Sequence, residues 1–365
     1  MPEYRQYELG SVCARLSSGK GIPASQVFNE GAFPVYGGNG LRGYTDHSNF
    51  RGDCAIIGRQ GAFCGNVRYF NGEAYMTEHA VVVCANECHN TRYLAYLLSQ
   101  MNLGRLSGQS AQPGLSVKTL AKQVIELPPL DVQNKVVAVL SSLDSKIALN
   151  EKINDILLAQ AQTLYKQFFP YGVQDDLPDG WRIGTVGEII EIHDSKRIPL
   201  SGADRTKMEK KIYPYYGAAS LMDFVDNYIF DGKYLLLGED GTVVDDAGYP
   251  ILQYVWGQFW VNNHAHILTG RLGYDVESLY MLFKQTPVKS IVTGAVQPKI
   301  SQANLRSVQV VIPPEHNLRE YNGLVEPLFS LFRANEEECK TFTALRDTLL
   351  PKLMSGEIDV SAVQL

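Results

Sequence analysis

Two long stretches of the chain carry apolar residues at alternating steps of three and four positions, a spacing that lines one face of a helix. In the first stretch, the positions on this face are Leu143, Ile147, Asn150, Asn154, Leu157, Ala161, Leu164 and Phe168. In the second stretch, they are Leu324, Leu328, Leu331, Asn335, Phe342, Leu345 and Leu349. Because these are the a and d positions of a coiled coil, the pattern predicts two long helices that pack against each other.

One asparagine recurs at the same place in both helical patterns. Asn150 and Asn335 lie 185 positions apart, the offset that also places Leu143 on Leu328. An asparagine in a coiled-coil seam costs stability, but a paired one fixes the register of the helices. We therefore predict that Asn150 and Asn335 pair and set the register. The alternative, an amphipathic helix packed only on its own domain, gives no reason for the repeated asparagine.

The segments before the two helices have a different pattern. Short apolar runs, such as residues 54–57, 80–83 and 234–237, are separated by turns rich in Gly and Asn, which indicates strands. One helix-like stretch follows in each segment, at residues 91–101 and 276–285. The pattern therefore predicts an α+β fold with two mixed α/β domains, each followed by a long helix.

The boundaries follow from proline and glycine positions. The predicted segments are a first domain (1–130), a first long helix (131–170), a linker (171–180), a second domain (181–314), a second long helix (315–356) and a C-terminal tail (357–365). Pro327 lies early in the second helix, and because proline removes a helix hydrogen bond, we expect the regular seam to begin only there.

The two domains are copies of one unit. Gln112-Pro113-Gly114-Leu115-Ser116 returns as Gln297-Pro298-Lys299-Ile300-Ser301, at an offset of 185. Earlier landmarks, Pro34-Val35-Tyr36-Gly37 and Pro214-Tyr215-Tyr216-Gly217, are offset by 180. The second copy therefore gains five residues between these landmarks, and the chain is a tandem duplication.

Composition limits the class of protein. The chain has 365 residues, of which 45% are hydrophobic and 20% charged, which is ordinary for globular domains. It has no apolar run of about 18 residues that could span a membrane, and its start lacks the regions of a signal peptide, so a cytoplasmic location is expected. Six scattered cysteines do not suggest a disulfide framework. Cys84, Cys88 and His89 have loose zinc spacing, but the second copy has no matching cysteine, so no metal site is predicted.

Charge is distributed unevenly. The formal net charge is −6, yet residues 1–130 carry 11 Lys and Arg against 9 Asp and Glu, whereas residues 171–314 carry 13 against 17. If the chain binds nucleic acid, phosphate contacts must come from local patches or from partner subunits.

No catalytic set survives the duplication. A hydrolase built on His79 with Glu78 or Cys84 would lose its partners in the second copy, where Asn263 and Thr269 stand at the corresponding positions. The sequence also lacks a phosphate-binding loop for ATP and the Asp-Pro-Pro-Tyr type of signature of amino-methyltransferases. We therefore predict no catalytic residues, no metal and no cofactor in this chain.

Several motifs, taken in order, resemble the specificity subunit of type I restriction-modification systems. They are Leu143-Asp144-Ser145-Lys146-Ile147-Ala148-Leu149-Asn150, the opening Leu177-Pro178-Asp179-Gly180-Trp181, and the ending from Leu345-Arg346-Asp347-Thr348-Leu349-Leu350-Pro351 to Ile358. The resemblance covers essentially the whole chain. The first domain departs from it, because it opens with Tyr7-Glu8-Leu9-Gly10 instead.

The resemblance implies a non-catalytic DNA-binding protein. Each domain would be a target recognition domain for one half of a bipartite sequence in double-stranded DNA, and the two helices would form an antiparallel coiled coil that acts as a spacer. Two modification (methyltransferase) subunits would dock on the chain and bring S-adenosylmethionine as their own cofactor. Restriction subunits, which are ATP-dependent endonucleases and translocases, join such complexes to cut DNA. No membrane association is implied. A two-domain protein-binding scaffold without DNA specificity is the alternative, and it would explain the acidity.

Base recognition needs side chains with paired donors and acceptors on loops that enter a groove. In the first domain, the candidate DNA-binding residues are Tyr36, Gly38, Asn39, Arg42, Arg59, Gln60, Asn66, Arg68, Gln109, Ser110 and Gln112. In the second domain, they are Tyr216, Ser220, Asn262, Asn263, Gln297 and Lys299. Solvated glycine turns are the alternative interpretation of these loops. Glu239-Asp240 replaces Arg59-Gln60 in the second copy, which predicts different bases, since a carboxylate can accept from cytosine. His79 and His264 are expected to be hydrogen-bonded residues that hold strand ends.

Overall fold

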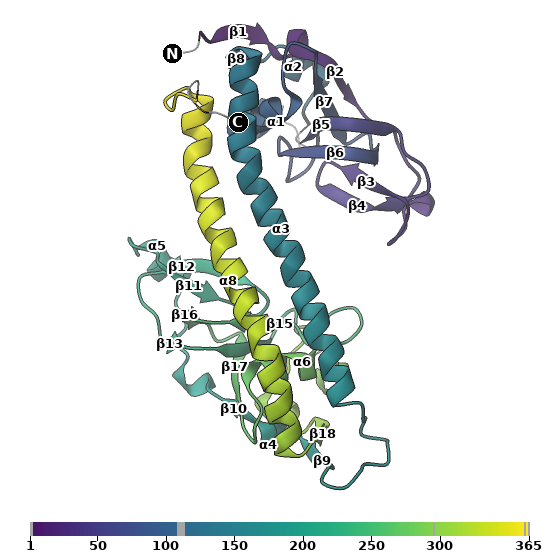
Figure 1. Cartoon of the computed structure of the whole chain (residues 1–365), viewed down its shortest axis with the longest axis vertical. Coiled ribbons are helices and arrows are strands. Elements are labelled where there is room, and N and C mark those ends of the chain that lie inside the picture. The colour runs from purple at the N-terminus through teal and green to yellow at the C-terminus, as the bar shows by residue number, and fades with distance from the viewer. Residues whose placement is uncertain (1–2, 108–113, 295, 361–362, 364–365) are drawn as a thin grey trace. The chain divides into compact units, whose positions relative to one another are not determined.

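The computed structural model describes residues 3–107, 114–294, 296–360 and 363. The chain divides into two compact units, Met1–Leu149 with Glu338–Leu365, and Asn150–Glu337 (Figure 1). The first and second predicted domains lie in different units, and each unit also contains a part of both long helices. Neither unit is therefore a sheet domain alone.

Unit 1 contains a six-stranded sheet and a two-stranded sheet. Its elements are β1 (Arg5–Glu8), η1 (Leu9–Val12), β2 (Cys13–Ser18), η2 (Ala24–Gln26), β3 (Phe33–Gly37), β4 (Gly40–Thr45), β5 (Phe50–Gly58), β6 (Val67–Met76), β7 (Ala80–Ala85), α1 (Thr91–Gln100), η3 (Leu103–Leu106), α2 (Val117–Ala121) and β8 (Val124–Leu127). The large sheet has the order β2-β7-β5-β6-β3-β4, and β1 pairs with β8. Only the β3–β6 pair in the large sheet is parallel.

The central strand β5 is buried on both faces. Ala55 and Ile57 enter a cluster that includes helix α1 and the long helices, whereas Cys54 and Ile56 enter a second cluster with Met76. Because successive side chains of a strand point to opposite faces, the continuous apolar run feeds two clusters at once.

Unit 2 repeats this plan with shorter strands. Its elements are β9 (Arg182–Thr185), α4 (Val186–Ile189), β10 (Ile190–Ile192), η4 (Asp194–Lys196), α5 (Gly202–Thr206), β11 (Tyr213–Tyr216), β12 (Leu221–Val225), β13 (Phe230–Asp231), β14 (Tyr234–Gly238), β15 (Leu252–Val255), β16 (Gln258–Val261), β17 (Ala265–Gly270), α6 (Val276–Phe283), η5 (Lys289–Ile291), α7 (Gln302–Arg306) and β18 (Gln309–Ile312). Its sheets have the orders β10-β17-β14-β15, β12-β11-β16-β13 and β18-β9.

The strand registers confirm the duplication. In unit 1, Val35 lies opposite Tyr75 in the parallel β3–β6 pair, and in unit 2, Tyr215 lies opposite Trp260 in the parallel β11–β16 pair. The first members of these pairs differ by 180 and the second by 185, as the sequence predicts. The five added residues therefore lie between the two strands, in the longer β14–β15 connection.

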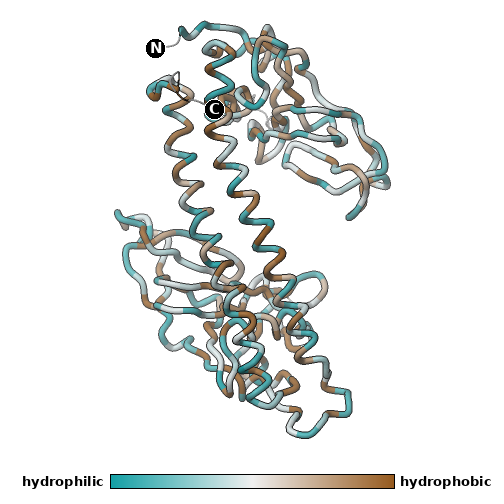
Figure 2. The backbone as a smooth tube through the Cα atoms, in the orientation of Figure 1, coloured by the Kyte–Doolittle hydropathy of each residue, from teal (hydrophilic) through white to brown (hydrophobic). Residues whose placement is uncertain are grey.

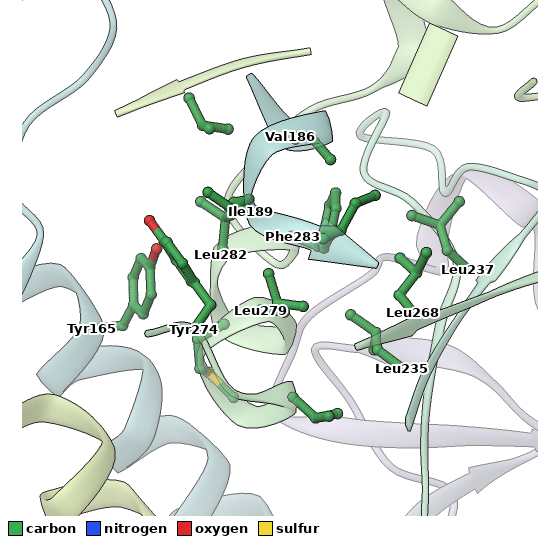
Figure 3. Packing of buried hydrophobic residues seen from close by; sticks show 14 of the residues in the cluster. Tyr165, Val186, Ile189, Leu235, Leu237, Leu268, Tyr274, Leu279, Leu282 and Phe283 are labelled. Atoms are coloured by element: carbon green, nitrogen blue, oxygen red, sulfur yellow. The ribbon is translucent and has the colours of Figure 1, made fainter. Parts of the chain in front are cut away.

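Helix α6 and strands β14 and β17 form the core of unit 2 (Figure 3). Leu235, Leu237 and Leu268 of the strands pack with Leu279 and Phe283 of the helix, and all five side chains are fully buried. The helix begins at a capping box, in which the amide of Ser278 donates to the Asp275 carboxylate at 2.7 Å. This cap satisfies an amide that would otherwise be unpaired in the first turn.

The long helices are α3 (Leu130–Phe168) and α8 (Glu315–Met354), and they pack antiparallel in each unit. In unit 1, Asp144 pairs with Arg346 at 3.2 Å. In unit 2, the Asn154 side chain accepts from Asn335 at 2.9 Å and the Ala161 carbonyl accepts from Tyr321 at 3.2 Å. Because partner numbers fall along α8 as they rise along α3, the predicted antiparallel packing and the α+β fold are confirmed.

The predicted pairing of Asn150 with Asn335 is wrong in detail. Asn335 donates to Asn154, one helical turn beyond Asn150, and Asn154 donates in turn to the Glu336 carboxylate at 2.9 Å. The reason is geometric, because positions related by the duplication do not face each other when the helices run in opposite directions. Asn150, Asn154 and Asn335 are all buried, so the polar layer itself is present.

The position of Asn154 in the repeat is taken by Cys339 in the other helix. The Asn154 side chain donates to the carbonyl of Phe332 at 3.3 Å, and the Cys339 thiol donates to the carbonyl of Ile147 at 3.7 Å. These bonds are related by the offset of 185, so both units retain the same interhelical contact with a different donor.

Two further expectations for α8 are wrong. The helix continues through Pro327, and Leu318, Tyr321 and Val325 are already buried before it. The residue four positions before the proline is Gly323, and both are exposed, so solvent can satisfy the carbonyl that the proline leaves without a donor.

Leu324, Leu331 and Leu345 do not lie in the seam, because their side chains are 48%, 47% and 45% exposed. The buried stripe is shifted by one position and includes Val325 and Phe329. Leucine positions alone do not identify the buried face of a helix, since exposed leucines are common on soluble helices.

Hydropathy alternates along both long helices (Figure 2). Among the residues that the structure describes, no helix is both long and apolar enough to cross a membrane.

Ion pairs link α1 and α6 to the long helices. The residue on the short helix is a cation in unit 1 and an anion in unit 2. In unit 1, Arg92 of α1 contacts Asp144 of α3 at 3.1 Å. In unit 2, Glu277 of α6 stands at the position that corresponds to Arg92, and it contacts Arg333 of α8 at 3.1 Å and Lys233 at 2.7 Å. Each domain therefore suits the charges of its own helix segment.

We expect Asn335→Leu to lower the free energy of unfolding by about 1–3 kcal/mol, because Asn154 loses a buried partner. The double variant Asn154→Leu/Asn335→Leu should lose less than the sum of the single losses, since neither buried amide is then left without the other. Chemical denaturation of the full chain measures both. Leu331→Asn, on an exposed position one turn away, serves as the control and should change stability little. Additive losses in the double variant would contradict the paired arrangement.

Candidate nucleic-acid interface

Four segments of the first domain are joined by main-chain hydrogen bonds at one edge of its large sheet. The amide of Arg59, just after β5, donates to the His79 carbonyl at 3.0 Å. The Arg59 carbonyl accepts from the amide of Leu115 at 2.8 Å. The amide of Thr77 donates to the Tyr36 carbonyl at 2.9 Å. The predicted loops after β3, β5 and β6 therefore lie together, although they are far apart in sequence.

The turn between β3 and β4 depends on glycine. Gly40 has a φ of +102°, which favours glycine. A Cβ atom on Gly38 would lie 3.0 Å from the His79 carbonyl oxygen and 3.4 Å from the Arg59 nitrogen. Only a residue without a side chain lets this turn approach the neighbouring loops so closely.

Three arginines surround this turn. A Cβ atom on Gly40 would lie 2.9 Å from the guanidinium carbon of Arg68, and one on Gly37 would lie 2.7 Å from the Cδ of Arg42. Arg42 and Arg68 are exposed, and Arg59 is half-buried. Within the described part of the chain, none of the three has a carboxylate within 4.0 Å. Their charges are therefore available to an anionic ligand.

The other candidate DNA-binding residues of the first domain differ in their exposure to solvent. Asn39, Gln60 and Asn66 are exposed near the arginines, and Gln60 forms an isolated bridge with Gly114. Tyr36 packs on Phe70, and burial raises the pKa of its hydroxyl, which stays a neutral hydrogen-bonding group. The predicted residues Gln109, Ser110 and Gln112 lie outside the described residues.

The second domain repeats the same main-chain arrangement. The amide of Glu239 donates to the His264 carbonyl at 2.8 Å, and the Glu239 carbonyl accepts from Ile300 at 2.8 Å. The amide of Asn262 donates to the Tyr216 carbonyl at 3.0 Å. These bonds correspond one by one to those of the first domain, so the two edges share a backbone and differ in side chains.

Asn262 has a structural position here. Its side chain is buried, accepts from the amide of His264 at 2.8 Å and contacts the sulfur of Met222 at 3.3 Å. It holds the turn, so its prediction as a DNA-binding residue is not supported by its exposure. Ser220, Asn263, Gln297 and Lys299 are exposed, and Tyr216 is half-buried against Phe259.

A buried ionic cluster lies beneath the loops of the second domain. Arg197 donates to Glu239 at 2.6 Å and contacts Asp194 at 3.4 Å, while Lys299 contacts Glu239 at 3.1 Å. His266 contacts Asp194 through Nδ1 at 2.6 Å and the Ile300 carbonyl through Nε2 at 2.8 Å. Each ring nitrogen of His266 therefore has a hydrogen-bond partner inside the cluster.

The cluster controls the ionisation of its acids. Burial opposes the charge on Asp194, but hydrogen bonds from His266 and the Ile267 amide and the charge of Arg197 hold its pKa below the usual value. Burial likewise opposes the charge on Glu239, and its pKa is lowered by Arg197, His266 and Lys299. Both carboxylates therefore remain ionised beneath the surface.

Asp194, Glu239 and His266 place potential metal ligands within 4.8 Å of one another. Their donors do not suit a metal in this arrangement. Arg197 and Lys299 already occupy the Glu239 carboxylate, and both nitrogens of His266 face acceptors. The arrangement is a salt-bridge network.

Glu239, which the sequence predicts to take part in base recognition, has a largely buried structural position instead. Its side chain is only 13% exposed and both carboxylate oxygens are held by cations. Asp240 pairs with His264 at 2.6 Å, which agrees with the expectation that His264 holds a strand end. His79 contacts Glu78 at 3.2 Å and its carbonyl accepts from Arg59. Asp194, Arg197 and His266 were missed, because residues so distant in sequence carry no shared spacing signal.

We expect Glu239→Gln to weaken the acid sensitivity of unit 2. A carboxyl group whose folded pKa is lowered contributes stability above its unfolded pKa, about 4.3 for Glu, and loses it as the pH falls through the lower folded pKa. The wild-type thermal midpoint should therefore fall more steeply below about pH 4.3 than that of the variant, which starts lower at pH 7. Glu191→Gln, in an exposed pair with Arg271 at 3.6 Å, is the control and should keep the wild-type slope. Equal slopes for wild type and Glu239→Gln would contradict the role of the cluster.

Comparison with known proteins gives a consistent result. The family described as type I restriction modification DNA specificity domain matches residues 1–159 and 178–320. The specificity subunit of the type I restriction enzyme EcoprrI from Escherichia coli is 35% identical over 147 residues, which are 39% of this chain and 36% of that protein. The specificity subunit of the enzyme MjaIX from Methanocaldococcus jannaschii is 24% identical over 306 residues, 74% of this chain and 69% of that protein.

Similarity to solved structures extends over nearly the whole chain. The type I restriction-modification S subunit from M. genitalium has a TM-score of 0.65 at 18% identity, and the match covers 96% of each chain. This likeness supports the fold, and the matched family domains account for both copies of the repeat. The chain belongs to the family of type I restriction-modification DNA specificity domains.

Proposed function

We propose that this chain is the subunit that recognises DNA in a type I restriction-modification complex, with each domain binding one half of a bipartite target. The observation that carries the proposal is the repeated edge, in which corresponding loops have the same main-chain bonds and different exposed side chains. Arg59 and Gln60 of one edge correspond to Glu239 and Asp240 of the other. Two loop regions with the same backbone arrangement and different side chains suit a protein that binds two different half-sites.

The exposed residues supply the chemistry for direct recognition. Arg42, Arg59 and Arg68 suit guanine edges or phosphates, and Asn39 and Gln60 suit adenine. Gly38 lets the turn come close to its neighbours and leaves the backbone accessible. In the second domain, the proposed contacts are Ser220, Asn263, Gln297 and Lys299, with the hydroxyl of Tyr216. Tyr36 and Asn66 complete the proposed surface.

We also propose that the chain is not catalytic. Burial raises the pKa of Cys54 and Cys13 to about 12, and burial also raises the pKa of Cys84, so these thiols are poor nucleophiles. The histidines of the two edges bond to neighbouring carboxylates that differ between the copies. Methyl transfer and its S-adenosylmethionine would belong to two modification subunits, and DNA cleavage to restriction subunits.

A two-domain protein-binding scaffold would explain the net charge of −6. It gives no reason for an edge with three arginines that lack carboxylate partners among the described residues, in a chain with an acidic excess. The DNA-binding interpretation accounts for that edge directly, because phosphate and guanine both attract guanidinium groups.

The proposal is tested by exchanging residues 1–130 for the first domain of another family member and expressing the chimera with its proposed methyltransferase partner. Sequencing of methylated bases in the host genome should show a motif with one half changed and the other half retained. The reciprocal exchange of residues 181–314 is the matched control and should change only the other half. Motifs whose halves change together would contradict one domain for each half-site.

We expect the purified chain alone to transfer no methyl group to DNA, because the proposed catalytic subunit is absent. Incubation with tritiated S-adenosylmethionine and genomic DNA measures transfer, and the complex with the methyltransferase is the positive control. Methylation by the single chain, free of the partner by mass spectrometry, would contradict the non-catalytic role.

A further inference from the structure

The two recognition edges differ most in their positive charge. Arg42, Arg59 and Arg68 of the first domain correspond to Met222, Glu239 and Gln253 of the second. Strand registers establish the correspondence at two of these positions. Arg68 lies opposite Ile56 and Gln253 opposite Leu236, while Leu41 and Leu221 lie opposite the equivalent tyrosines. Every cation of this set is therefore lost in the second copy.

Two cations of the second domain, Arg197 and Lys299, are paired with acids. Arg197 has a side chain that is 14% exposed, and it contacts both Asp194 and Glu239. Lys299, which corresponds to Gly114 of the first domain, contacts Glu239 at 3.1 Å. Asp194 and Glu239 thus offset the charge of Arg197, and Glu239 also pairs with the exposed Lys299.

One exposed lysine follows the first strand of the large sheet in each domain. Lys20 and Lys196 are exposed and follow the corresponding strands β2 and β10, so they contribute to both edges alike. The difference between the edges is therefore the three arginines of the first domain.

We infer that the first domain holds the DNA phosphates through Arg42, Arg59 and Arg68, whereas the second domain binds its half-site with little phosphate neutralisation. This inference rests on the proposed DNA-binding function and divides it unequally between the domains. The first domain then supplies most of the salt-dependent affinity of the two recognition edges. The second domain depends on hydrogen bonds and shape, which salt weakens far less.

The physical consequence is measurable because each phosphate that a cation neutralises releases counterions. The slope of log K against log salt concentration changes by about 0.9 for each such contact on duplex DNA. Three contacts in the first domain therefore account for about 2.7 of the total slope.

The experiment uses the full chain in complex with its methyltransferase and a fluorescein-labelled 40-base-pair duplex that contains the target found by methylation sequencing. Fluorescence anisotropy gives the binding constant at several KCl concentrations. The variant Arg42→Gln/Arg59→Gln/Arg68→Gln should lower the magnitude of the slope by about 2–3. Lys299→Gln should lower it by less than about 1.

Two control variants test whether the change in slope depends on charge at the recognition edge. Arg51→Gln removes an exposed arginine at the opposite end of β5 and should leave the slope unchanged. Met222→Arg adds a cation at a side chain that is 53% exposed and should raise the slope by up to about 1. Circular dichroism and thermal unfolding verify that each variant is folded.

The outcomes are distinct. A wild-type slope retained in the folded triple variant overturns the unequal division while leaving DNA binding intact. An equal loss of slope in Lys299→Gln and in the triple variant also overturns it. Absence of DNA binding by the wild-type complex overturns the proposed function and this inference together.

Discussion

The main-chain hydrogen bonds that join the loops at each recognition edge are the constraint on which the rest of the structure depends. In the first domain, Arg59 bonds to His79 and Leu115, and in the second domain, Glu239 bonds to His264 and Ile300 at the corresponding positions. Because these bonds use only backbone atoms, they restrict the side chains little. The loops can therefore keep one arrangement while their exposed residues change, which is the property that a protein with two different half-sites requires.

In the second domain, the replacement of Arg59 by Glu239 is accompanied by a different set of buried residues beneath the loops. An acid at position 239 would be costly beneath the loops if it were unpaired, and the structure surrounds it with Arg197 and Lys299. His266 and Asp194 extend this cluster, whereas the residue that corresponds to His266 in the first domain is the buried Val81. The same backbone arrangement therefore covers an apolar residue, Val81, in the first copy and an ionic cluster around His266 in the second.

The long helices show the same division between retained geometry and altered chemistry. Asn154 and Cys339 make equivalent interhelical contacts with different donors, and Arg92 and Glu277 make equivalent domain-to-helix contacts with opposite charges. The opposite charges of Arg92 and Glu277 affect which helix segment each domain can pack against. Glu277 would face Asp144, and Arg92 would face Arg333, if the domains were placed on each other's helix segments. Like charges would oppose that arrangement, so the ion pairs favour the observed one.

The sequence by itself determined the duplication, the two mixed domains and the two long helices, because repeats and apolar periodicity are local or linear signals. The antiparallel direction of the helices was implied only by the resemblance to specificity subunits. It also selected Tyr36, Arg59 and their counterparts, which lie in or just after strand ends that the structure brings together. Only the tertiary structure decided which asparagines pair, since an antiparallel arrangement reverses the order of one helix. It alone showed that Asn262 and Glu239 face inward, because burial depends on neighbours distant in sequence. The cluster of Asp194, Arg197 and His266 had no linear signal, since its members meet only when the strands are assembled.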